Sequence, residues 1–479
     1  MDSSPPPVVV FAVNGERAVV RCDGAGDVDP GASLLEFLRS RTRFTGTKLG
    51  CAEGGCGACV VLLSTYDAAA DEVTHATISS CLTLVNGLHH RAVTTTEGLG
   101  STRKGHHAVH KRLAGFHASQ CGYCTPGFCM SLAGALVGAE GKGKVAASRP
   151  QPLEGFSRLT AAEAERAVAG NLCRCTGYRA IADACKSFAA DVDLEDLGLN
   201  SFWKKGDACV SKLPPYMERS IAMFPEFLKD EIRSSLGIAH STSSTSVGSA
   251  SSWYRPQNVE DYYKQIRSSS YEKSRTKVVV GNTSSGVYRD AEVYDRYLDL
   301  RAIPELNSVN KDAKGVEIGA AISISQVIEI LRGEGNSCKD VVFCKIADHM
   351  EKVASQFVRN MASLGGNLIM AQRDEFASDI ATVLLAAGSS VCIQVSSKRL
   401  NVTLEQFLDM PPCDYATLLL GIYIPYGTPN GVLLSSESVN KGGEKQMEHQ
   451  EIVYCRSYVW HLVHMEPNML SGLQMLRIS

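Results

Sequence analysis

Short runs of apolar and β-branched residues alternate with polar turns in the first part of the chain. Residues 8–13 and 18–22 form two such runs, and the Asn-Gly pair between them is a strong signal for a β-hairpin. Ser33 stands directly before an amphipathic run at 34–39, which predicts a helix capped by a serine side chain. Another apolar run at 60–63 predicts one more strand. Hairpin, helix and strand in this order predict a small α+β domain.

Helical patterns then replace the strand patterns. We expect a helix over 106–119 and a second one that has Pro126 at its first position, where a missing N–H costs nothing. The segment 160–163 has the sequence of a capping box and predicts a short third helix. Thr176 is placed to cap a fourth. This part of the chain is therefore expected to be all-helical.

The composition changes again after the helices. Residues 191–196 are acidic, and residues 241–252 are almost entirely Ser, Thr and Gly, which is typical of a flexible linker. A new domain is expected to start near Trp253.

Strand and helix patterns alternate in the next region. Apolar runs at 277–280, 316–320 and 417–424 predict strands, and the periodic stretch 326–332 predicts a helix. This alternation indicates an α+β domain.

Length and composition narrow the class of protein. The chain has 479 residues, enough for about three domains, each with its own core. A net charge of −3 gives no sign of a nucleic-acid or anionic-membrane partner, and no apolar run is long enough to span a membrane. The N-terminus lacks the pattern of a secretory signal. The 17 cysteines stand partly in metal-type spacings, so we expect a cytoplasmic protein whose thiols stay reduced.

Four cysteines in the first domain have the spacing of a plant-type [2Fe–2S] ferredoxin. Cys51, Cys56 and Cys59 follow a C-x4-C-x2-C pattern, and Cys81 lies downstream. Glycines between them let a loop wrap closely around a cluster and point N–H groups at its sulfurs. Zinc is the alternative, but zinc sites usually use two C-x2–4-C hooks. The spacing favours iron, and the first domain then reads as a ferredoxin-like β-grasp domain.

A second set of four cysteines belongs to the helical region. Cys121 and Cys124 form a C-x2-C pair, and Cys173 and Cys175 form a C-x-C pair. Both pairs precede expected helices, whose N-terminal partial positive charge stabilises thiolates. This pattern alone leaves zinc and iron–sulfur open. A second cluster beside the first is the more economical interpretation, because two centres can exchange electrons.

Two turns in the α+β domain are candidates for binding. The Gly- and Ser-rich turn at 281–286 follows a buried strand and can offer N–H groups to a phosphate, although plain turns share this composition. A second Gly-rich loop is expected at 362–367. Asp379 stands before an apolar helix, and its simplest role is a helix cap.

Five stretches in fixed order resemble the molybdenum hydroxylases, and within that family the plant aldehyde oxidases. They are GCAEGGCGACVVL, QCGYCTPGFCMSL, AGNLCRCTGYRAIADACKSF, VVVGNTSSGVY and ASLGGNLIMAQ. The resemblance implies a relay in which electrons from a molybdenum cofactor cross two [2Fe–2S] clusters to FAD. It implies two cluster-binding sets, Cys51, Cys56, Cys59 and Cys81, and Cys121, Cys124, Cys173 and Cys175. It implies FAD contacts at Lys277, Val278, Val279, Val280, Gly281, Asn282, Thr283, Ser284, Ser363, Asp379 and Leu420.

The resemblance also sets the expected domain order. The fold class is a multidomain α+β protein with a β-grasp ferredoxin-like domain, an all-helical [2Fe–2S] domain and an incomplete α+β FAD-binding domain. The expected boundaries are 1–100, 101–190, a linker at 191–252, the FAD-binding domain at 253–425, and an unmatched tail at 426–479.

Two departures from the family pattern matter. Ala52 stands where the family usually has glycine, and if that position needs a positive φ the strain is about 1 kcal/mol. The tail reads like a frameshifted or alternatively spliced end. We therefore expect no molybdopterin binding, no catalytic base and no aldehyde hydroxylation by this chain alone. The alternatives to an electron-transfer fragment are a non-catalytic partner of a full-length molybdenum hydroxylase or of a second copy of the chain, and an inactive truncated product.

Overall fold

A computed structural model describes most of the chain up to residue 426. The described residues are 8–21, 28–103, 105–140, 151–204, 206–217, 221, 224–235, 252–267, 275–288, 294–333 and 340–426. The predicted tail, apart from residue 426, and nearly all of the Ser/Thr/Gly stretch at 241–252 lie outside these ranges. No helix in the described ranges is both long and apolar enough to cross a membrane.

The first part is a five-stranded sheet that contains the predicted hairpin and strand, and the predicted helix packs on one of its faces. Val13 pairs with Glu16, so Asn14 and Gly15 form a two-residue turn, both with positive φ (50° and 83°). Ser33 caps the helix in a complete capping box with Glu36. The sheet order is β2-β1-β5-β3-β4, with bounds β1 Val8–Val13, β2 Glu16–Arg21, β3 Val60–Asp67, β4 Glu72–Ser79 and β5 Arg91–Thr94, and the helix is α1 Leu34–Arg41.

Four helices form the second part, as predicted, although two of them begin elsewhere. The predicted helix 106–119 is shorter, and the last helix begins at Arg179 after Tyr178, not after Thr176. Thr176 does not cap it; its hydroxyl instead accepts from the Tyr178 N–H within the preceding turn. The helices are α2 Ala108–Gly115, α3 Thr125–Glu140, α5 Ala161–Val168 and α6 Arg179–Lys186.

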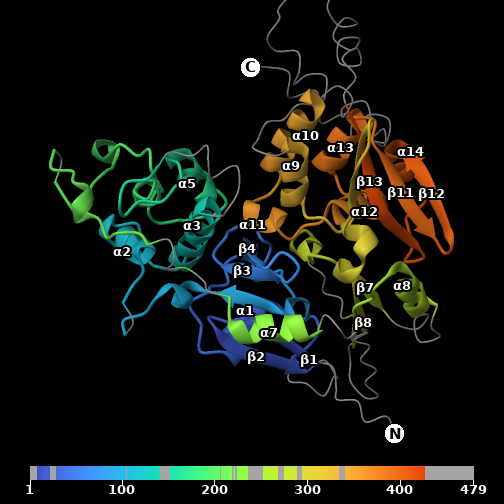
Figure 1. Cartoon of the computed structure of the whole chain (residues 1–479), viewed down its shortest axis with the longest axis horizontal. Helices are drawn as coiled ribbons and strands as arrows, with labels where there is room; N and C mark the ends of the chain where they lie inside the picture. Colours follow the sequence, from blue (N-terminus) through green and yellow to red (C-terminus); the bar gives the residue numbers. More distant parts are fainter. Residues whose placement is uncertain are drawn as a thin grey trace, which may run out of the picture.

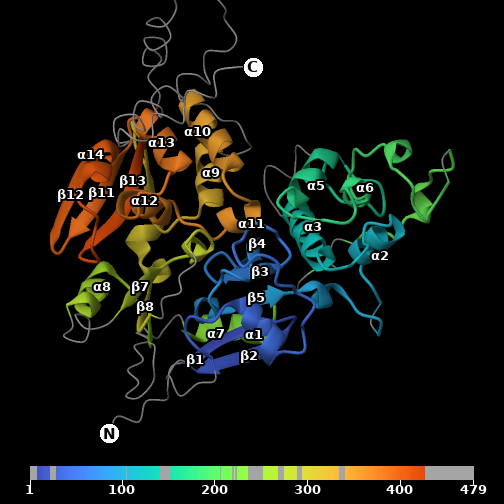
Figure 2. The same cartoon turned by 180° about the vertical axis from the view of Figure 1, so that it is seen from behind.

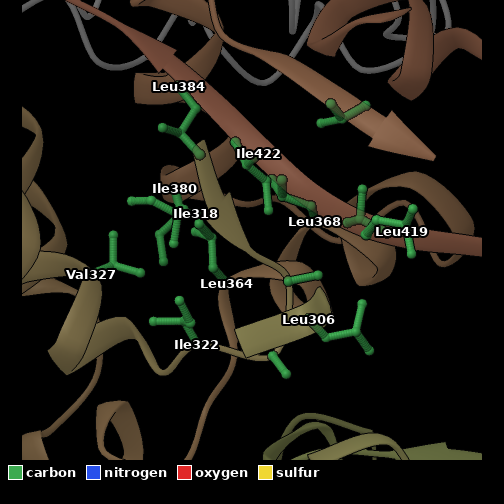
Figure 3. Close-up of a cluster of buried hydrophobic side chains, with 14 of the residues drawn as sticks. Leu306, Ile318, Ile322, Val327, Leu364, Leu368, Ile380, Leu384, Leu419 and Ile422 are labelled. Atoms are coloured by element: carbon green, nitrogen blue, oxygen red, sulfur yellow. The ribbon is translucent and has the colours of Figure 1, made fainter. Parts of the chain in front are cut away.

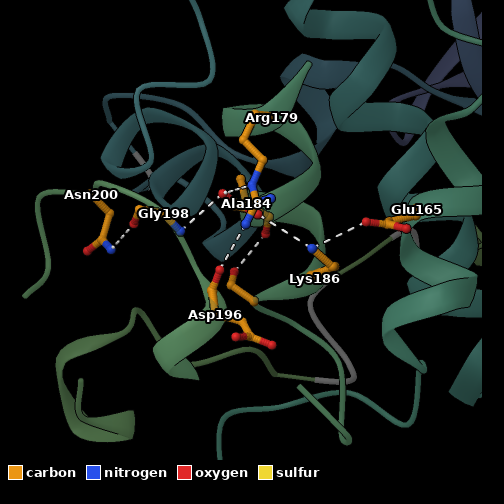
Figure 4. A network of polar contacts seen from close by, with 9 residues as sticks. Glu165, Arg179, Ala184, Lys186, Asp196, Gly198 and Asn200 are labelled. Carbon is orange, nitrogen blue, oxygen red and sulfur yellow. Dashed lines mark hydrogen bonds and ion pairs between the residues drawn. The ribbon is translucent and has the colours of Figure 1, made fainter. Parts of the chain in front are cut away.

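The stretch predicted as a linker begins as a folded strap on the helical part. Buried Asp183 of α6 accepts from the Arg179 side chain at 2.9 Å and from the Gly198 N–H at 3.1 Å. Arg179 also donates to the Asp196 carbonyl, and Lys186 bridges to Glu165 (Figure 4). These bonds hold the residues around the short helix η3 (Leu194–Asp196) against α6, and a further short helix, η4, covers Val210–Lys212.

Later residues of the same stretch return to the first sheet. Helix α7 (Glu226–Ser235) places Leu228 against Val10, Ala12 and Tyr66, so it covers the sheet face opposite α1. Burial of these apolar side chains stabilises the helix there. The stretch therefore covers parts of both preceding domains as well as joining them to the third.

The third part contains two sheets, one parallel and one antiparallel. The small parallel sheet has the order β6-β8-β7 (Ser252–Tyr254, Arg296–Asp299, Thr276–Val279), and the larger sheet has the order β12-β11-β13-β10-β9. The strands of the larger sheet are β9 Val309–Lys311, β10 Gly315–Gly319, β11 Ser390–Val395, β12 Lys398–Thr403 and β13 Thr417–Pro425. The predicted α+β character is confirmed.

Helices cover the larger sheet and share one apolar core with it. Ile318 of β10 and Ile422 of β13 point toward Val327, Leu364 and Ile380 of three helices (Figure 3). The predicted loop 362–367 is helical from Leu364, because the Ser363 side chain accepts from the Gly366 N–H and caps a helix there. The helices of this part are α8 Val259–Ile266, α9 Ile324–Arg332, α10 Val341–Lys352, α11 Gln356–Arg359, α12 Leu364–Arg373, α13 Asp379–Ala386 and α14 Leu404–Asp409, with short helices η6 Thr283–Gly286, η7 Leu300–Ala302 and η8 Pro304–Asn307.

The sheet of the first part lies between the other two parts in both views (Figures 1 and 2). Helix α11 of the third part meets β4 of the first, where the Asn360 side chain donates to the Thr77 carbonyl at 2.9 Å. Phe357 of α11 is buried in the core of the helical part. The three parts therefore meet at one junction.

Candidate functional site

The first cysteine group forms two pairs around one loop. Cys51 and Cys56 lie before β3, where burial, followed by the nearby Cys51 thiol, raises the pKa of Cys56. Cys59 and Cys81 have their sulfurs 3.3 Å apart. Two thiolates on one tetrahedral metal lie about 3.7 Å apart if each metal–sulfur bond is about 2.3 Å, as for zinc. The separation of the second pair is close to that value.

A local hydrogen bond favours ionisation of one thiol in this group, that of Cys59. The bond shared with Cys81 lowers the pKa of Cys59 to about 7, and the same bond raises the pKa of Cys81. The Glu53 N–H donates to the Cys51 sulfur at 3.3 Å. The loop therefore already points a backbone donor at a sulfur, as a cluster site requires.

A close approach explains one glycine of this loop. A Cβ added at Gly50 would lie 2.5 Å from the Cys56 sulfur. Any other residue would push the thiol away from the position that the pair needs.

The second cysteine group is also paired across two loops. Cys121 lies close enough to Cys175, and Cys124 to Cys173, for the thiols to influence each other's ionisation, so each pair takes one member from each motif. The Thr176 hydroxyl lies 3.2 Å from the Cys173 sulfur. Burial, together with the bond to Cys173, raises the pKa of Cys124 to about 12. Cys121 and Cys175 are exposed, whereas Cys173 is buried.

The chemistry of the donors fits two binuclear clusters better than single metal ions. Within the described ranges, no three His, Cys, Asp or Glu side chains are grouped so that they could hold one metal ion. Each group instead offers two cysteine pairs, and a [2Fe–2S] cluster needs two thiolates for each of its two irons.

The two cysteine groups touch each other through the main chain. The Leu172 N–H donates to the Cys56 carbonyl at 2.9 Å, and Leu172 precedes Cys173. The Asn171 side chain donates to the Gly57 carbonyl at 3.0 Å, and the Tyr123 hydroxyl donates to the Leu49 carbonyl at 2.5 Å. Residues adjacent to both groups are thus joined directly.

A cavity of about 590 Å³ opens in the third part, within the size range of sites for cofactors. Nine of the eleven predicted flavin contacts line it: Lys277, Val278, Val279, Val280, Gly281, Asn282, Thr283, Ser284 and Ser363. The other two do not. Asp379 is the exposed first residue of α13, whose cap is Ser378, and Leu420 is buried in the core on β13.

The lining of this cavity is suited to a phosphate-bearing ligand at one end. A Cβ added at Gly281 would lie 1.8 Å from the Met361 carbonyl oxygen, so two backbone segments meet there without a side chain between them. Lys277 places its ammonium 3.0 Å from the Ser285 hydroxyl, next to the turn. Cations and exposed main-chain N–H groups of such turns favour anions. The lining therefore fits the pyrophosphate of FAD.

Several aromatic residues of the lining were missed from the sequence. Tyr262, Tyr288, Tyr294 and Tyr415 come from four different segments. The Tyr415 hydroxyl donates to the Thr276 carbonyl at 2.6 Å and ties β7 to the region before β13. No local motif marks these tyrosines, because only the fold gathers them.

The other described cysteines do not belong to either group of four. Free thiols are found at Cys129, Cys185, Cys209, Cys392 and Cys413. Cys344 is the exception to the expectation of free thiols, because it is bonded in a disulfide.

Three family models match successive parts of the chain. Residues 22–86 match a 2Fe-2S iron-sulfur cluster binding domain, and residues 95–186 match a [2Fe-2S] binding domain. Residues 246–427 match the FAD binding domain in molybdopterin dehydrogenase.

Plant aldehyde oxidases are among the similar proteins. Probable aldehyde oxidase 3 of Oryza sativa subsp. japonica is 58% identical over 430 residues, which is 88% of this chain and 31% of the relative. An indole-3-acetaldehyde oxidase of Zea mays is 58% identical over 426 residues, 88% of this chain and 30% of the relative. Probable aldehyde oxidase 4 of O. sativa is 55% identical, over 87% of this chain and 50% of its own length. The chain thus spans a third to a half of these relatives. Two iron–sulfur domains followed by this FAD-binding domain, together with these identities, show that the chain belongs to the molybdenum hydroxylase family.

Proposed function

We propose that this chain is the electron-transfer part of an aldehyde oxidase. The proposal rests on the contact between the two cysteine groups, with a cofactor-sized cavity beside the first of them. When bound, the clusters carry single electrons and FAD accepts pairs of them. The chain's own residues hold these groups in sequence.

The proposal assigns a role to each group of residues. Cys51 and Cys56 hold one iron of the first cluster, and Cys59 and Cys81 hold the other, because the sulfurs pair in this way. By the same reasoning, the second cluster is held by two pairs that each combine both motifs: Cys121 with Cys175, and Cys124 with Cys173. The turn at 281–284 and Ser363 hold FAD. The boundaries near residues 100, 190 and 253 are those predicted above.

An exposed apolar surface surrounds the second cysteine group. Its members are exposed by 44–57%: Leu49 at 49%, Tyr123 at 50%, Leu172 at 57% and Tyr178 at 44%. A patch of large apolar side chains of this kind marks an interaction site. We propose that a molybdopterin-binding polypeptide covers it and that electrons from an aldehyde would enter the cluster held by the second cysteine group, on the side of its exposed members, Cys121 and Cys175.

Cofactor analysis tests the electron-transfer proposal. We expect the anaerobically purified, cluster-loaded 479-residue chain to contain four irons, four sulfides and one FAD. Cys59→Ala and Cys121→Ala should each reduce iron to two per chain, because each removes a ligand of one cluster only. Cys129→Ala, which changes a buried cysteine outside both groups, should retain four. A wild-type chain without iron would overturn the proposal.

A binding measurement tests the partner. We expect the molybdopterin-binding part of a plant aldehyde oxidase to bind the chain and Leu172→Asp to weaken that binding at least tenfold. Leu199→Asp is the matched control, because Leu199 is 87% exposed but lies in the strap. Equal affinities for the two variants would show that the surface around Cys121 and Cys175 is not the interface.

A further inference from the structure

One side chain of the cavity lining reaches across to the first cysteine group. The Asn282 amide nitrogen donates to the Leu82 carbonyl at 2.9 Å, and Leu82 follows Cys81. Asn282 has a positive φ of 57°, a conformation that asparagine adopts more readily than most residues. This backbone conformation turns the side chain toward the neighbouring domain.

The other end of the same amide is held inside the cavity wall. The Ser285 hydroxyl donates to the Asn282 amide oxygen at 3.0 Å, and the Lys277 ammonium donates to the Ser285 hydroxyl at 3.0 Å. Oxygen and nitrogen of the amide therefore both have partners, which fixes its orientation. A continuous chain of hydrogen bonds runs from Lys277 to the residue after Cys81.

A backbone contact at Gly286, four residues after Asn282, joins the cavity wall to the loop that carries Cys51. A Cβ added at Gly286 would lie 2.4 Å from the Glu53 carbonyl oxygen, so the two backbones pack directly. Glu53 lies two residues after Cys51. The wall of the cavity thus rests on both segments that carry the first group of cysteines.

We propose that Asn282 is a positioning residue that sets the rate of electron passage between the first cluster and FAD. The inference rests on the proposed function, since it requires both groups to be bound. In each passage the reduced cluster loses one electron and returns to its oxidised state, and the flavin gains that electron. Two such passages and two protons from water complete FAD reduction. Asn282 holds the wall of the FAD cavity against the segment that carries Cys81. Its hydrogen bond to Leu82 provides a bonded path between the two sites.

The chain offers a matched control for this bond. Asn360 also donates its side-chain amide to a carbonyl of the first domain, that of Thr77, at the same distance of 2.9 Å. It joins the same two parts of the molecule, but it is neither in the cavity lining nor beside a cysteine of the group. Loss of domain docking alone would affect both positions equally.

Pulse radiolysis of the full chain loaded with clusters and FAD tests the inference. A radical reductant loads the clusters, and flavin absorbance then reports intramolecular transfer. With FAD reconstituted to one per chain, we expect Asn282→Asp and Asn282→Gly to slow this transfer at least tenfold while the iron content and the reduction potentials of both groups stay unchanged. The glycine variant keeps the positive φ and removes only the side chain. Asn360→Asp should stay within twofold of wild type.

Four other outcomes would contradict the inference or the function on which it rests. A rate within twofold of wild type in both Asn282 variants would overturn it, and so would an equal loss in Asn360→Asp, which would indicate docking alone. A slowing that disappears when excess FAD is added would assign the effect of Asn282 to cofactor binding alone and would overturn the positioning role. A wild-type chain that loads with clusters but binds no FAD would overturn the FAD part of the proposed function as well.

Discussion

The main-chain N–H of Leu172 donates a 2.9 Å hydrogen bond to the carbonyl oxygen of Cys56. Cys56 belongs to the first cysteine group, and Leu172 stands beside Cys173 of the second. A path made of covalent bonds and this one hydrogen bond therefore connects Cys56 with Cys173. The geometry of this contact therefore depends on residues that dock the helical part onto the loop at 51–59.

Asn171 is the residue that most directly supports this docking. It is buried and donates to the Gly57 carbonyl at 3.0 Å. Asn171→Ala leaves that carbonyl without its donor, which should lower the free energy of unfolding by about 1–3 kcal/mol. Chemical denaturation checks the loss, and faster hydrogen exchange at the Leu172 amide would locate it. Asn200→Ala, which removes three side-chain hydrogen bonds within the strap, to Gly198, Phe202 and Trp203, should leave the Leu172 amide protected.

Ala52 stores strain in the cluster loop. Its φ is 61°, so this position does need a positive φ, a conformation that the Cβ of alanine disfavours. We expect Ala52→Gly to stabilise the apo chain, although the gain is about 1 kcal/mol at most because glycine also increases the entropy of the unfolded chain. Gly55→Ala is a suitable comparison, since that φ is not positive and an added Cβ meets no atom within 4 Å. A loss of stability in Ala52→Gly would contradict the strain argument.

His107 should make the helical part sensitive to acid. Its ring nitrogen accepts from the Val109 N–H and caps α2, while burial, followed by the nearby charges of His110, Arg112 and Lys111, lowers its pKa to about 4. Between pH 6.5 and about 4, His107 is therefore protonated in the unfolded chain but still neutral in the folded chain. The stabilisation is complete above pH 6.5 and is lost as the pH falls toward 4, by up to about 3 kcal/mol.

The matched variant for this prediction is His107→Asn, which retains a capping acceptor but does not titrate in this range. Urea unfolding at several pH values should show a shallower decline between pH 6.5 and 4 than in wild type. Parallel pH profiles for the two proteins would assign the acid sensitivity to other groups.

Arg112 joins the helical part to the end of the strap. The side chain is fully buried and donates to the carbonyls of Pro214, Ser187 and Gly155, with its guanidinium 4.1 Å from the centre of the Phe188 ring. Arg112→Met removes three donors from buried carbonyls, so we expect a loss on the order of 4 kcal/mol in the free energy of unfolding. Arg17→Met, which breaks a partly exposed ion pair with Glu231 and a guanidinium contact with the Phe227 ring, should cost less than about 1 kcal/mol.

Local chemistry made much of the fold predictable. The hairpin turn at Asn14 and Gly15, the serine cap at Ser33 and the capping box at Thr160 were all confirmed, because each depends on residues within a few positions of one another. Predictions that needed a choice between neighbouring residues were less successful. Ser378 caps α13 in place of Asp379, and the helix after Thr176 begins three residues later. At α13 both candidates were chemically suitable, whereas the last helix begins after Tyr178 with no side-chain cap, which no sequence rule predicts.

The sequence by itself determined the ingredients of the site: eight cysteines in two spacings and a turn rich in glycine and serine. These are local patterns, and the chemistry of their side chains is the same in any fold. Only the tertiary structure decided which cysteines pair, that Leu172 meets Cys56, and that Asn282 reaches Leu82 across 200 positions of sequence. Such contacts arise when buried apolar faces of separate domains pack together, and no local pattern of residues specifies where those faces meet.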